Sequence, residues 1–203
     1  MSNVRPYRDA MPEPSTTDQQ LLRKMDSGDE NAFRLLYRRY QGPLFRFVLH
    51  MTGSRATAEE VTQEVFMHLI SKPHSYDPTR APLAAYLIGV ARNLARRAVQ
   101  NTSTDVCLED AEEVDVAASP GIELTERLSN SEAFGLLRKA LLGLPDVYRE
   151  VIVLCDLEEM SYAEAAAIAQ CSEGTIASRL HRAHNMLRLK LVRVPAKGVR
   201  IRS

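Results

Sequence analysis

Residues 161–188 read SYAEAAAIAQCSEGTIASRLHRAHNMLR, a pattern typical of two helices joined by a tight turn. Ser161 and Glu164 have the spacing of a capping box, which predicts that the first helix begins directly after Ser161. Gln170 stands at the turn, where we expect a positive φ angle, and Ser172 can cap the second helix. Small side chains let two helices cross closely, as a helix-turn-helix requires. The first helix supplies three of them, Ala165, Ala166 and Ala169.

The second helix, from Glu173 onward, has two dissimilar faces. Its apolar stripe consists of Ile176, Leu180, Ala183 and Leu187. Its opposite face carries hydrogen-bonding side chains, namely Thr175, Ser178, His181, Arg182 and Asn185. No acidic residue follows Glu173, whereas eight Lys and Arg residues do. An ordinary amphipathic helix would have such a stripe too, but the missing acids and the preceding turn favour a helix that lies in the major groove of DNA.

The same helix carries His181 and His184, which could suggest a metal site. Their i, i+3 spacing differs from the i, i+4 spacing of a helical zinc pair, and no third ligand stands near them. Elsewhere the sequence has no nucleophile–base pair and no glycine-rich phosphate loop. We therefore expect no metal, no cofactor and no enzymatic activity.

Helix signals dominate the rest of the 203 residues as well, so the sequence predicts an all-α fold. Capping pairs indicate further helix starts at Ser27 with Glu30, Thr57 with Glu60 and Ser129 with Glu132. Pro145 indicates another start, because proline suits the first helical turn. Breaks are indicated at Gly53–Ser54, over 71–82 and over 101–121.

The charge pattern divides the chain into three parts. The whole chain has 26 basic and 26 acidic residues, but residues 1–104 have 14 and 10, residues 105–132 have one and nine, and residues 133–203 have 11 and 7. The acidic part is too polar to bury a core, so we expect a flexible linker there. The sequence thus predicts two small helical domains, 18–102 and 131–192, joined by an acidic linker over 103–130. A disordered segment over 1–17 and a basic tail over 193–203 complete the predicted organisation.

The composition also bears on the cellular compartment. Three cysteines, Cys107, Cys155 and Cys171, are too few and too scattered for a disulfide framework. No window approaches the roughly 18 apolar residues of a membrane span, and the amino terminus is polar where a secretory signal would be apolar. We expect a cytoplasmic protein that does not insert into a membrane.

A helix over 57–70 is expected to bury most of its circumference, through Val61, Val65, Phe66, Leu69 and Ile70. The narrow remaining face carries Glu60, Gln63, Glu64 and Met67 at helical spacing. Such a face is either solvated surface or a docking site for a basic partner helix. A di-metal site is disfavoured, because Glu64 and His68 lack the Glu-x-x-His spacing.

A helix over 84–99 differs in kind. Leu87, Ala91, Leu94 and Ala98 are expected to face inward. The far side carries Arg92, Asn93 and Arg96, beside Ala85 and Gly89, whose small size leaves room for a nucleic-acid strand. Upstream, Tyr76 lies in a proline-bounded loop, where an aromatic ring can stack on an unpaired base. The residues alone leave a plain basic helix and a nucleic-acid-binding helix equally open.

The carboxy-terminal part resembles region 4 of the extracytoplasmic-function (ECF) sigma factors. The resemblance is carried by LP at 144–145, by S-Y-x-E-x-A from Ser161 and by C-x-x-G-T-x-x-S-R-L-x-R-A from Cys171. It implies that the second helix reads the −35 promoter element as duplex DNA. The positions implied to contact bases are Ser178, His181 and Arg182, and those implied to contact the backbone are Thr175 and Arg179. Ser172 and Ala177 depart from the family, which has Pro and Lys or Arg at these positions.

The amino-terminal part is similar to sigma region 2. The matching segments are DENAFRLLYRRYQGPLFRFVLHMTG at 29–53, AEEVTQEVFMHLI at 58–70 and YDPTRAPLAAYLIGVARNLARR at 76–97. The similarity implies that Glu60, Gln63, Glu64 and Met67 dock on core RNA polymerase. It further implies that the later loop and helix capture the melted, single-stranded −10 element, through Tyr76, Arg92, Asn93, Arg96 and Arg97. Tyr86 stands where the family commonly has Trp.

These resemblances predict a promoter-specificity factor whose partners are core RNA polymerase, double-stranded −35 DNA and single-stranded −10 DNA. They also imply an anti-sigma protein as a partner, because members of the family are often held inactive by one. The alternative hypothesis is a dimeric helix-turn-helix regulator that acts without core polymerase. It predicts a homodimer and a palindromic binding site.

Overall fold

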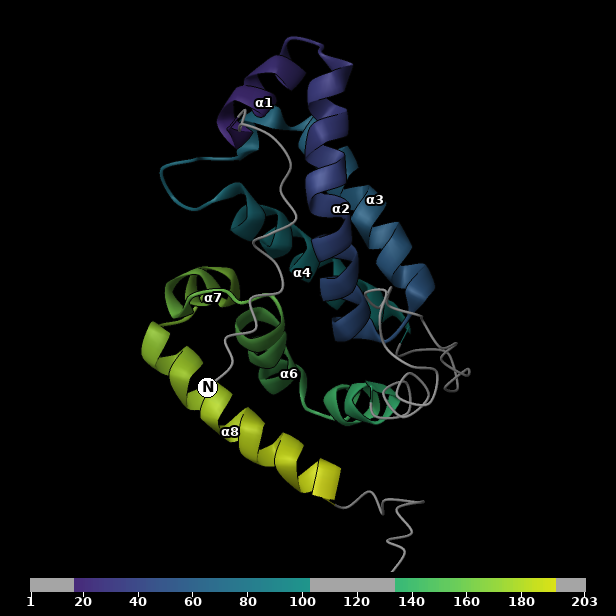
Figure 1. Ribbon diagram of the computed structural model, residues 1–203, viewed down its shortest axis with the longest axis vertical. Coiled ribbons are helices and arrows are strands. Elements are labelled where there is room, and N and C mark those ends of the chain that lie inside the picture. Colours follow the sequence, from purple (N-terminus) through teal and green to yellow (C-terminus); the bar gives the residue numbers. More distant parts are fainter. Residues whose placement is uncertain (1–16, 103–133, 193–203) are drawn as a thin grey trace, which may run out of the picture. The chain divides into compact units, whose positions relative to one another are not determined.

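The computed structural model describes residues 17–102 and 134–192. Over these two ranges the backbone forms helices and turns and contains no β-strand (Figure 1), which confirms the all-α prediction. The predicted linker over 103–130 and the basic tail over 193–203 lie outside the described residues. So does the predicted amino-terminal segment except Thr17.

The chain forms two compact units, Met1–Arg39 and Tyr40–Ser203. The domain boundaries expected from the sequence, 18–102 and 131–192, stay a prediction.

The first unit contains α1 (Asp18–Asp26) and the start of α2 (Glu30–Thr52). Helix α1 begins at a capping box, in which the Thr17 hydroxyl accepts from the Gln20 amide at 3.3 Å and the Gln20 side chain accepts from the Thr17 amide at 3.0 Å. Arg39 of α2 forms an ion pair with Asp18 of α1. A charged pair thus joins two helices of this unit.

The expected cap at Ser27 is wrong, because α1 extends to Asp26 and Ser27 follows it directly. The Ser27 hydroxyl donates to the carbonyl of Lys24 at 2.7 Å. Asp29 caps α2 instead, since its Oδ1 accepts from the amides of Asn31 and Ala32 at 2.9 and 3.3 Å.

In the second unit, α2 ends at Thr52 and is followed by Gly53, whose φ is +75°. Helix α3 (Arg55–Ser71) begins two residues later. Ser54 is the N-cap of α3, where Thr57 was predicted, and its hydroxyl accepts from the Thr57 amide at 3.2 Å. The helix therefore starts a little earlier than expected. The predicted break over 71–82 holds a short 3₁₀ turn, η1 (Pro73–Ser75), before α4 (Leu83–Thr102) begins.

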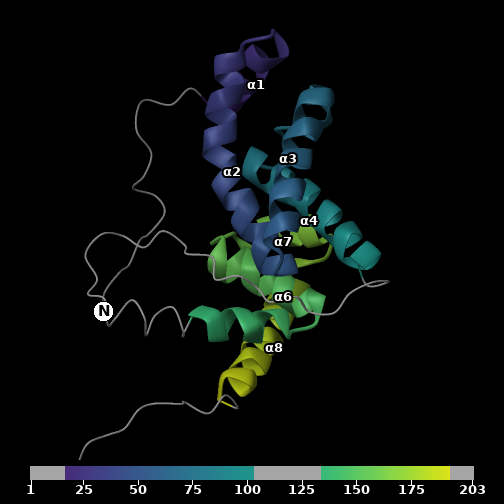
Figure 2. The same ribbon diagram turned by 90° about the vertical axis from the view of Figure 1, so that its right-hand side faces the viewer.

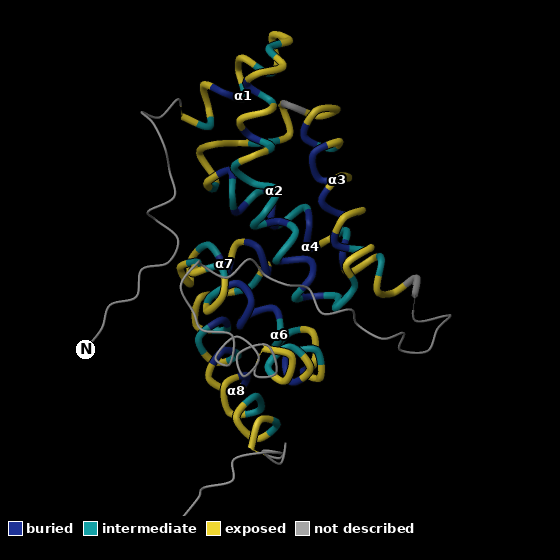
Figure 3. Tube along the Cα trace, turned by 45° about the vertical axis from the view of Figure 1, so that its right-hand side comes forward, coloured by how far each residue is buried: buried dark blue, intermediate teal, exposed yellow. Residues whose placement is uncertain are grey.

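Helices α3 and α4 pack together in this unit. The buried side chains of α3 are Ala58, Val61, Thr62, Val65, Phe66 and Leu69, and those of α4 include Leu83, Leu87, Ile88 and Ala91. Figure 3 shows these buried stretches beside exposed ones. Ile70 was predicted to be buried, but it is 47% exposed, because it continues the exposed face of α3 that carries Gln63 and Met67, whereas the neighbouring Leu69 is fully buried.

The carboxy-terminal part of the second unit is helical over 134–142 and continues with four further elements. These are α6 (Asp146–Ile152), the π-helical turn η2 (Val153–Leu157), α7 (Tyr162–Ala169) and α8 (Glu173–Val192). Helix α6 starts directly after Pro145, as expected. Helix α8 packs against both α6 and α7, and α7 also contacts α4 (Figures 1 and 2).

The helix-turn-helix forms as predicted. The capping box at Ser161 is present, with the hydroxyl accepting from the Glu164 amide at 3.3 Å and Glu164 Oε2 accepting from the Ser161 amide at 2.9 Å. Gln170 ends α7 at φ +56°, which confirms the expected positive angle. Ser172 accepts from the Thr175 amide at 3.2 Å and so caps α8.

No helix within residues 17–102 or 134–192 is long and apolar enough to span a membrane.

Candidate nucleic-acid interface

Helix α8 separates an apolar face from a polar face. Ile176, Leu180 and Ala183 are buried, and Leu187 is half-buried. The predicted polar face lies on the surface: Ser178, His181, Arg182 and Asn185 are exposed, and Thr175 and Arg179 are half-buried. The burial of one stripe thus fixes which side chains of α8 a partner can reach.

Local contacts hold several of these side chains in place. The Thr175 hydroxyl shares a hydrogen bond of 2.9 Å with that of Ser172, so this side chain belongs to the helix cap. His181 Nε2 and the side-chain Nδ2 of Asn185 lie within hydrogen-bond distance, 3.2 Å apart. Arg182 has no hydrogen-bond or ion-pair partner among the described residues. Its guanidinium is therefore available to an external acceptor.

The histidines of α8 do not converge on a metal position. His184 pairs with Asp156 of η2 at 2.6 Å, whereas His181 faces Asn185. Over residues 17–102 and 134–192 no three His, Cys, Asp or Glu side chains are grouped so that they could hold a metal ion. Cys155 and Cys171 are free thiols. Burial raises the pKa of the Cys155 thiol, and the nearby Asp156 carboxylate raises it further. Cys107 lies outside the described residues.

The loop before α4 is held by its own side chains. The Tyr76 hydroxyl donates to the carbonyl of Ala81 at 3.1 Å, and its ring lies 5.3 Å from that of Tyr86. Asp77 accepts from the Thr79 hydroxyl and amide at 2.6 and 2.9 Å, and these bonds lower the pKa of its carboxyl group. Tyr76 is thus half-buried in an ordered loop rather than freely exposed.

Tyr86 connects this loop to α3. Its hydroxyl shares a hydrogen bond of 2.6 Å with Ser75 and lies 3.3 Å from His68 Nε2. Its ring contacts that of Tyr76, so Tyr86 helps to position Tyr76, a role that was not expected from the sequence. The two tyrosines that flank the proline-bounded loop were the feature of the sequence from which this role could have been predicted.

The basic face of α4 is divided. Asn93, Arg96 and Arg97 are exposed, as predicted, and neither arginine has an ion-pair partner in the described part of the chain. Arg92 is different, since only 7% of its side chain is exposed. The expectation that Arg92 projects into solvent beside Asn93 and Arg96 is therefore wrong for this conformation.

Arg92 is buried because α6 covers it. Its Nε donates to Oε1 of Glu150, and its Nη2 lies 3.4 Å from Oε2 of the same carboxylate. Glu150 is itself 3% exposed at the side chain. Ala85, Ile88 and Ala95 are buried along the same stripe of α4. The expected exposure of Ala85 is therefore wrong as well.

The acidic face of α3 lies entirely on the surface. Glu60, Gln63 and Glu64 are exposed, and Met67 is 63% exposed. None of the three polar side chains has an ion-pair partner among residues 17–102 and 134–192. The predicted docking face is thus left uncovered by the described residues and presents two carboxylates and one apolar side chain.

A cluster of charged groups lies near the end of α2. Burial lowers the pKa of His50, and Arg138 and Arg46 lower it further. Burial also raises the pKa of Glu158 to about 7, although the charge of Arg46 acts in the opposite direction. None of these four residues is among the predicted DNA-binding residues.

Comparison with known proteins assigns both halves of the chain. Residues 36–104 match sigma-70 region 2, and residues 134–187 match sigma-70 region 4. The chain is 31% identical to the ECF RNA polymerase sigma-E factor of Haemophilus influenzae, over 86% of this chain and 95% of that protein. It is 32% identical to the sigma-E factor of Escherichia coli, over 84% of this chain and 92% of that protein.

A solved structure is similar in sequence and fold. It is the sigma factor RpoE in complex with the anti-sigma factor NepR from Bartonella quintana, with 27% identity and a TM-score of 0.59. The match covers 80% of this chain and 98% of that one. With two region matches in the expected order, the chain belongs to the ECF family of RNA polymerase sigma factors, promoter-specificity subunits that act with RNA polymerase in transcription initiation.

Proposed function

We propose that α8 reads the −35 element of duplex promoter DNA. The observation that carries this proposal is the exposed, acid-free front of α8, opposite a buried apolar stripe. Ser178, His181 and Arg182 reach base edges in the major groove, where each base pair presents a distinct set of donors and acceptors. Thr175 and Arg179 contact the phosphate backbone and fix the register of the helix.

The loop before α4 and the exposed side of α4 capture the −10 element as single-stranded DNA. Arg96 and Arg97 are exposed cations that suit phosphates, Asn93 lies beside them, and Tyr76 offers a half-buried ring to a flipped base. Arg92 joins this set only in a conformation in which Glu150 releases it.

The face made by Glu60, Gln63, Glu64 and Met67 docks on core RNA polymerase. Two exposed carboxylates around an exposed methionine suit a basic helix with an apolar contact at its centre. This proposal assigns the polymerase contact and the DNA contacts to different helices, so they can be tested separately.

Promoter opening in this scheme requires no covalent chemistry from the chain. The melted state is favoured because the chain binds single-stranded −10 DNA more tightly than the duplex, and such differential affinity shifts a two-state equilibrium. Polymerase holds both DNA-binding parts at once, which raises their effective concentration to about millimolar. We place this activity in the cytoplasm.

An anti-sigma protein is a further proposed partner. The similar Bartonella quintana protein was solved in complex with one. The chain would then alternate between a polymerase-bound and an inhibitor-bound form.

In vitro transcription with purified core polymerase and a promoter library tests the proposal, together with the native mass of the free chain. We expect a monomer that directs transcription from a defined class of promoters only when core polymerase is present. A homodimer that binds palindromic DNA tightly without polymerase would contradict the proposal and support the rival regulator.

A further inference from the structure

Two charged side chains, Arg92 of α4 and Glu150 of α6, form a bidentate ion pair in the interior of the second unit. They are 58 residues apart in the sequence, and their side chains are 7% and 3% exposed. Removing two charges from water is costly unless their geometry satisfies both groups. Both guanidinium contacts go to the same carboxylate, so each charge compensates the other.

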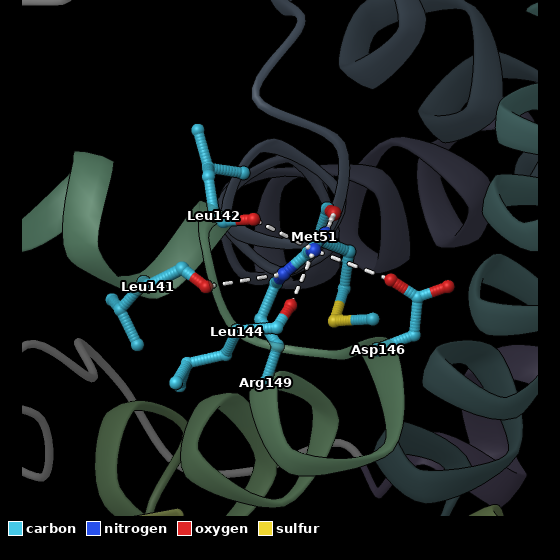
Figure 4. Close-up of polar contacts among 6 residues, drawn as sticks. All are labelled: Met51, Leu141, Leu142, Leu144, Asp146 and Arg149. Carbon is cyan, nitrogen blue, oxygen red and sulfur yellow. Dashed lines mark hydrogen bonds and ion pairs between the residues drawn. The ribbon is translucent and has the colours of Figure 1, made fainter. Parts of the chain in front are cut away.

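A second arginine, Arg149 of α6, attaches α6 to the end of α2 (Figure 4). The guanidinium of Arg149 donates to the carbonyls of Leu141, Leu142 and Leu144 at 3.3, 3.0 and 2.9 Å, and also to the carbonyl of Met51 in the last turn of α2. It forms an ion pair with Asp146 at 3.2 Å. The last carbonyls of a helix lack partners within that helix, so Arg149 supplies one to α2 and attaches α6 to its end.

A third contact acts at the same place. Arg138 Nη2 donates to the carbonyl of Gly53 at 2.7 Å, directly after the end of α2. The carboxy-terminal part thus contacts α2 through Arg138 and Arg149 and contacts α4 through Glu150. A closed arrangement with three such contacts withholds Arg92 from solvent.

From this geometry we infer that Glu150 is an internal competitor of DNA for Arg92. The inference rests on the proposed role of α4 in binding single-stranded −10 DNA. A carboxylate and a phosphate both accept two hydrogen bonds from one guanidinium, so Glu150 occupies the position that a backbone phosphate would take. The free chain is closed at its −10 surface, and opening transfers Arg92 from Glu150 to DNA.

The closed arrangement affects the two DNA-binding surfaces differently. Ser178, His181 and Arg182 of α8 remain exposed while Arg92 is buried. The ion pair therefore limits single-stranded DNA binding and leaves duplex binding by α8 unchanged. This difference separates a specific competition from a general loss of folding.

Glu150→Gln in the full chain tests the competition, because the amide keeps the volume of the side chain and removes its charge. A buried charge that loses its partner destabilises the closed state, whereas the open state leaves Arg92 in water. Affinity for a labelled single-stranded oligonucleotide of mixed sequence, about 20 nucleotides long, should rise about tenfold, while affinity for the matching duplex stays constant. Glu159→Gln, at an exposed carboxylate, is the matched control and should change neither affinity.

Arginine modification by phenylglyoxal, followed by peptide mass spectrometry, measures the burial of Arg92 directly. Arg96, one turn further along α4 and exposed, is the internal reference. In the wild-type chain Arg92 should react about tenfold more slowly than Arg96, as expected for a buried ion pair, and in Glu150→Gln the two rates should become similar. Equal rates in the wild-type chain would overturn the inference.

Two further variants keep the test decisive. Should Glu150→Gln fail to fold by circular dichroism, Glu150→Asp shortens the side chain by one methylene, breaks the bidentate geometry and carries the same expectations. Arg96→Gln, made in the Glu150→Gln background, should lower affinity for the single strand. If Arg96→Gln lowers this affinity but Glu150→Gln did not raise it, the competition is overturned; if Arg96→Gln has no effect, the proposed role of α4 fails.

Discussion

Gly53 at the end of α2 lies against the side chain of Leu142, so that a Cβ atom on Gly53 would be 2.8 Å from Leu142 Cδ1 and 3.2 Å from Cδ2. Gly53 also has a backbone φ of +75°, which residues other than glycine rarely adopt. Its carbonyl accepts from Arg138. The positive φ thus favours glycine where α2 meets residues 138–142, and an added Cβ would in addition displace the Leu142 side chain.

Gly53→Ala should destabilise the fold through both effects. We expect a loss of about 1 kcal/mol from the positive φ and about 1 kcal/mol more from displacing Leu142, measured by urea unfolding. Gly28→Ala is the matched control, because Gly28 has a φ of +90° but no atom within 4 Å of the added Cβ. Equal losses in the two variants would show that the approach of Leu142 contributes nothing.

Gln170→Gly should stabilise the helix-turn-helix. Gln170 adopts φ +56° and ψ +47° at the end of α7, a left-handed conformation that glycine adopts without strain. We expect a gain of about 1 kcal/mol in the free energy of unfolding. Ala167→Gly, at an exposed position inside the same helix, should instead lose about 1 kcal/mol. A loss in both variants would contradict the assignment of strain to Gln170.

Glu158→Gln should alter the pH dependence of stability. Burial raises the pKa of Glu158 from 4.5 to about 7, so between these values the folded chain holds a proton that the unfolded chain has released. The contribution of this group is therefore fully present below pH 4.5 and is lost as the pH rises through about 7. At pH 8 the variant should be more stable than the wild type by about 1–3 kcal/mol.

Unfolding in urea at pH 5 and at pH 8 measures this difference. Glu159→Gln makes the same chemical change at the next, exposed position and should leave the pH profile of the wild type unaltered. A Glu158→Gln profile parallel to that of the wild type would exclude a buried proton at Glu158.

Arg182→Ala should weaken promoter binding by about 1–3 kcal/mol and relax the preference at one base position. The reason is that Arg182 is exposed, without a partner in the described part of the chain, on the face of α8 proposed to enter the major groove. Selection of binding sites from a randomised −35 library, with holoenzyme, measures both effects. Arg188→Ala removes the same charge further along α8 and should leave base preference unchanged. A uniform loss across all sequences would assign Arg182 to the DNA backbone.

Glu60→Lys combined with Glu64→Lys should abolish association with core polymerase while leaving helicity intact. Both carboxylates are exposed on α3 and have no ion-pair partner among the described residues, so their reversal repels a basic partner without breaking an ion pair within residues 17–102 and 134–192. A pull-down with purified core polymerase is the measurement. Glu59→Lys, on the same helix beside Arg55, controls for charge reversal as such. Normal association of the double variant would remove α3 from the docking site.

Much of the fold follows from local rules that act within a few residues. The capping box at Ser161, the turn at Gln170 and the start of α8 after Ser172 depend on hydrogen bonds between residues three to five positions apart, and all three occur where the sequence placed them. The polar and apolar faces of α8 follow from helical periodicity for the same reason. Where a better cap lay nearby, as Ser54 lies near Thr57, the prediction erred by a few residues.

Only the tertiary structure decided which face of α4 is buried. Ala85 and Arg92 were predicted to belong to an open basic surface, because a small residue and an arginine carry no apolar signal of burial. The buried ion pair of Arg92 is with Glu150, which is 58 residues away and shows no sign of a buried carboxylate in its own helix. The sequence by itself determined the helices and the reading face of α8, since these depend on neighbours in the chain. The burial of Arg92 could not be predicted from its neighbours in the sequence. It depends on a tertiary contact with a distant segment, because the free energy of a buried charge is set by the groups that surround it.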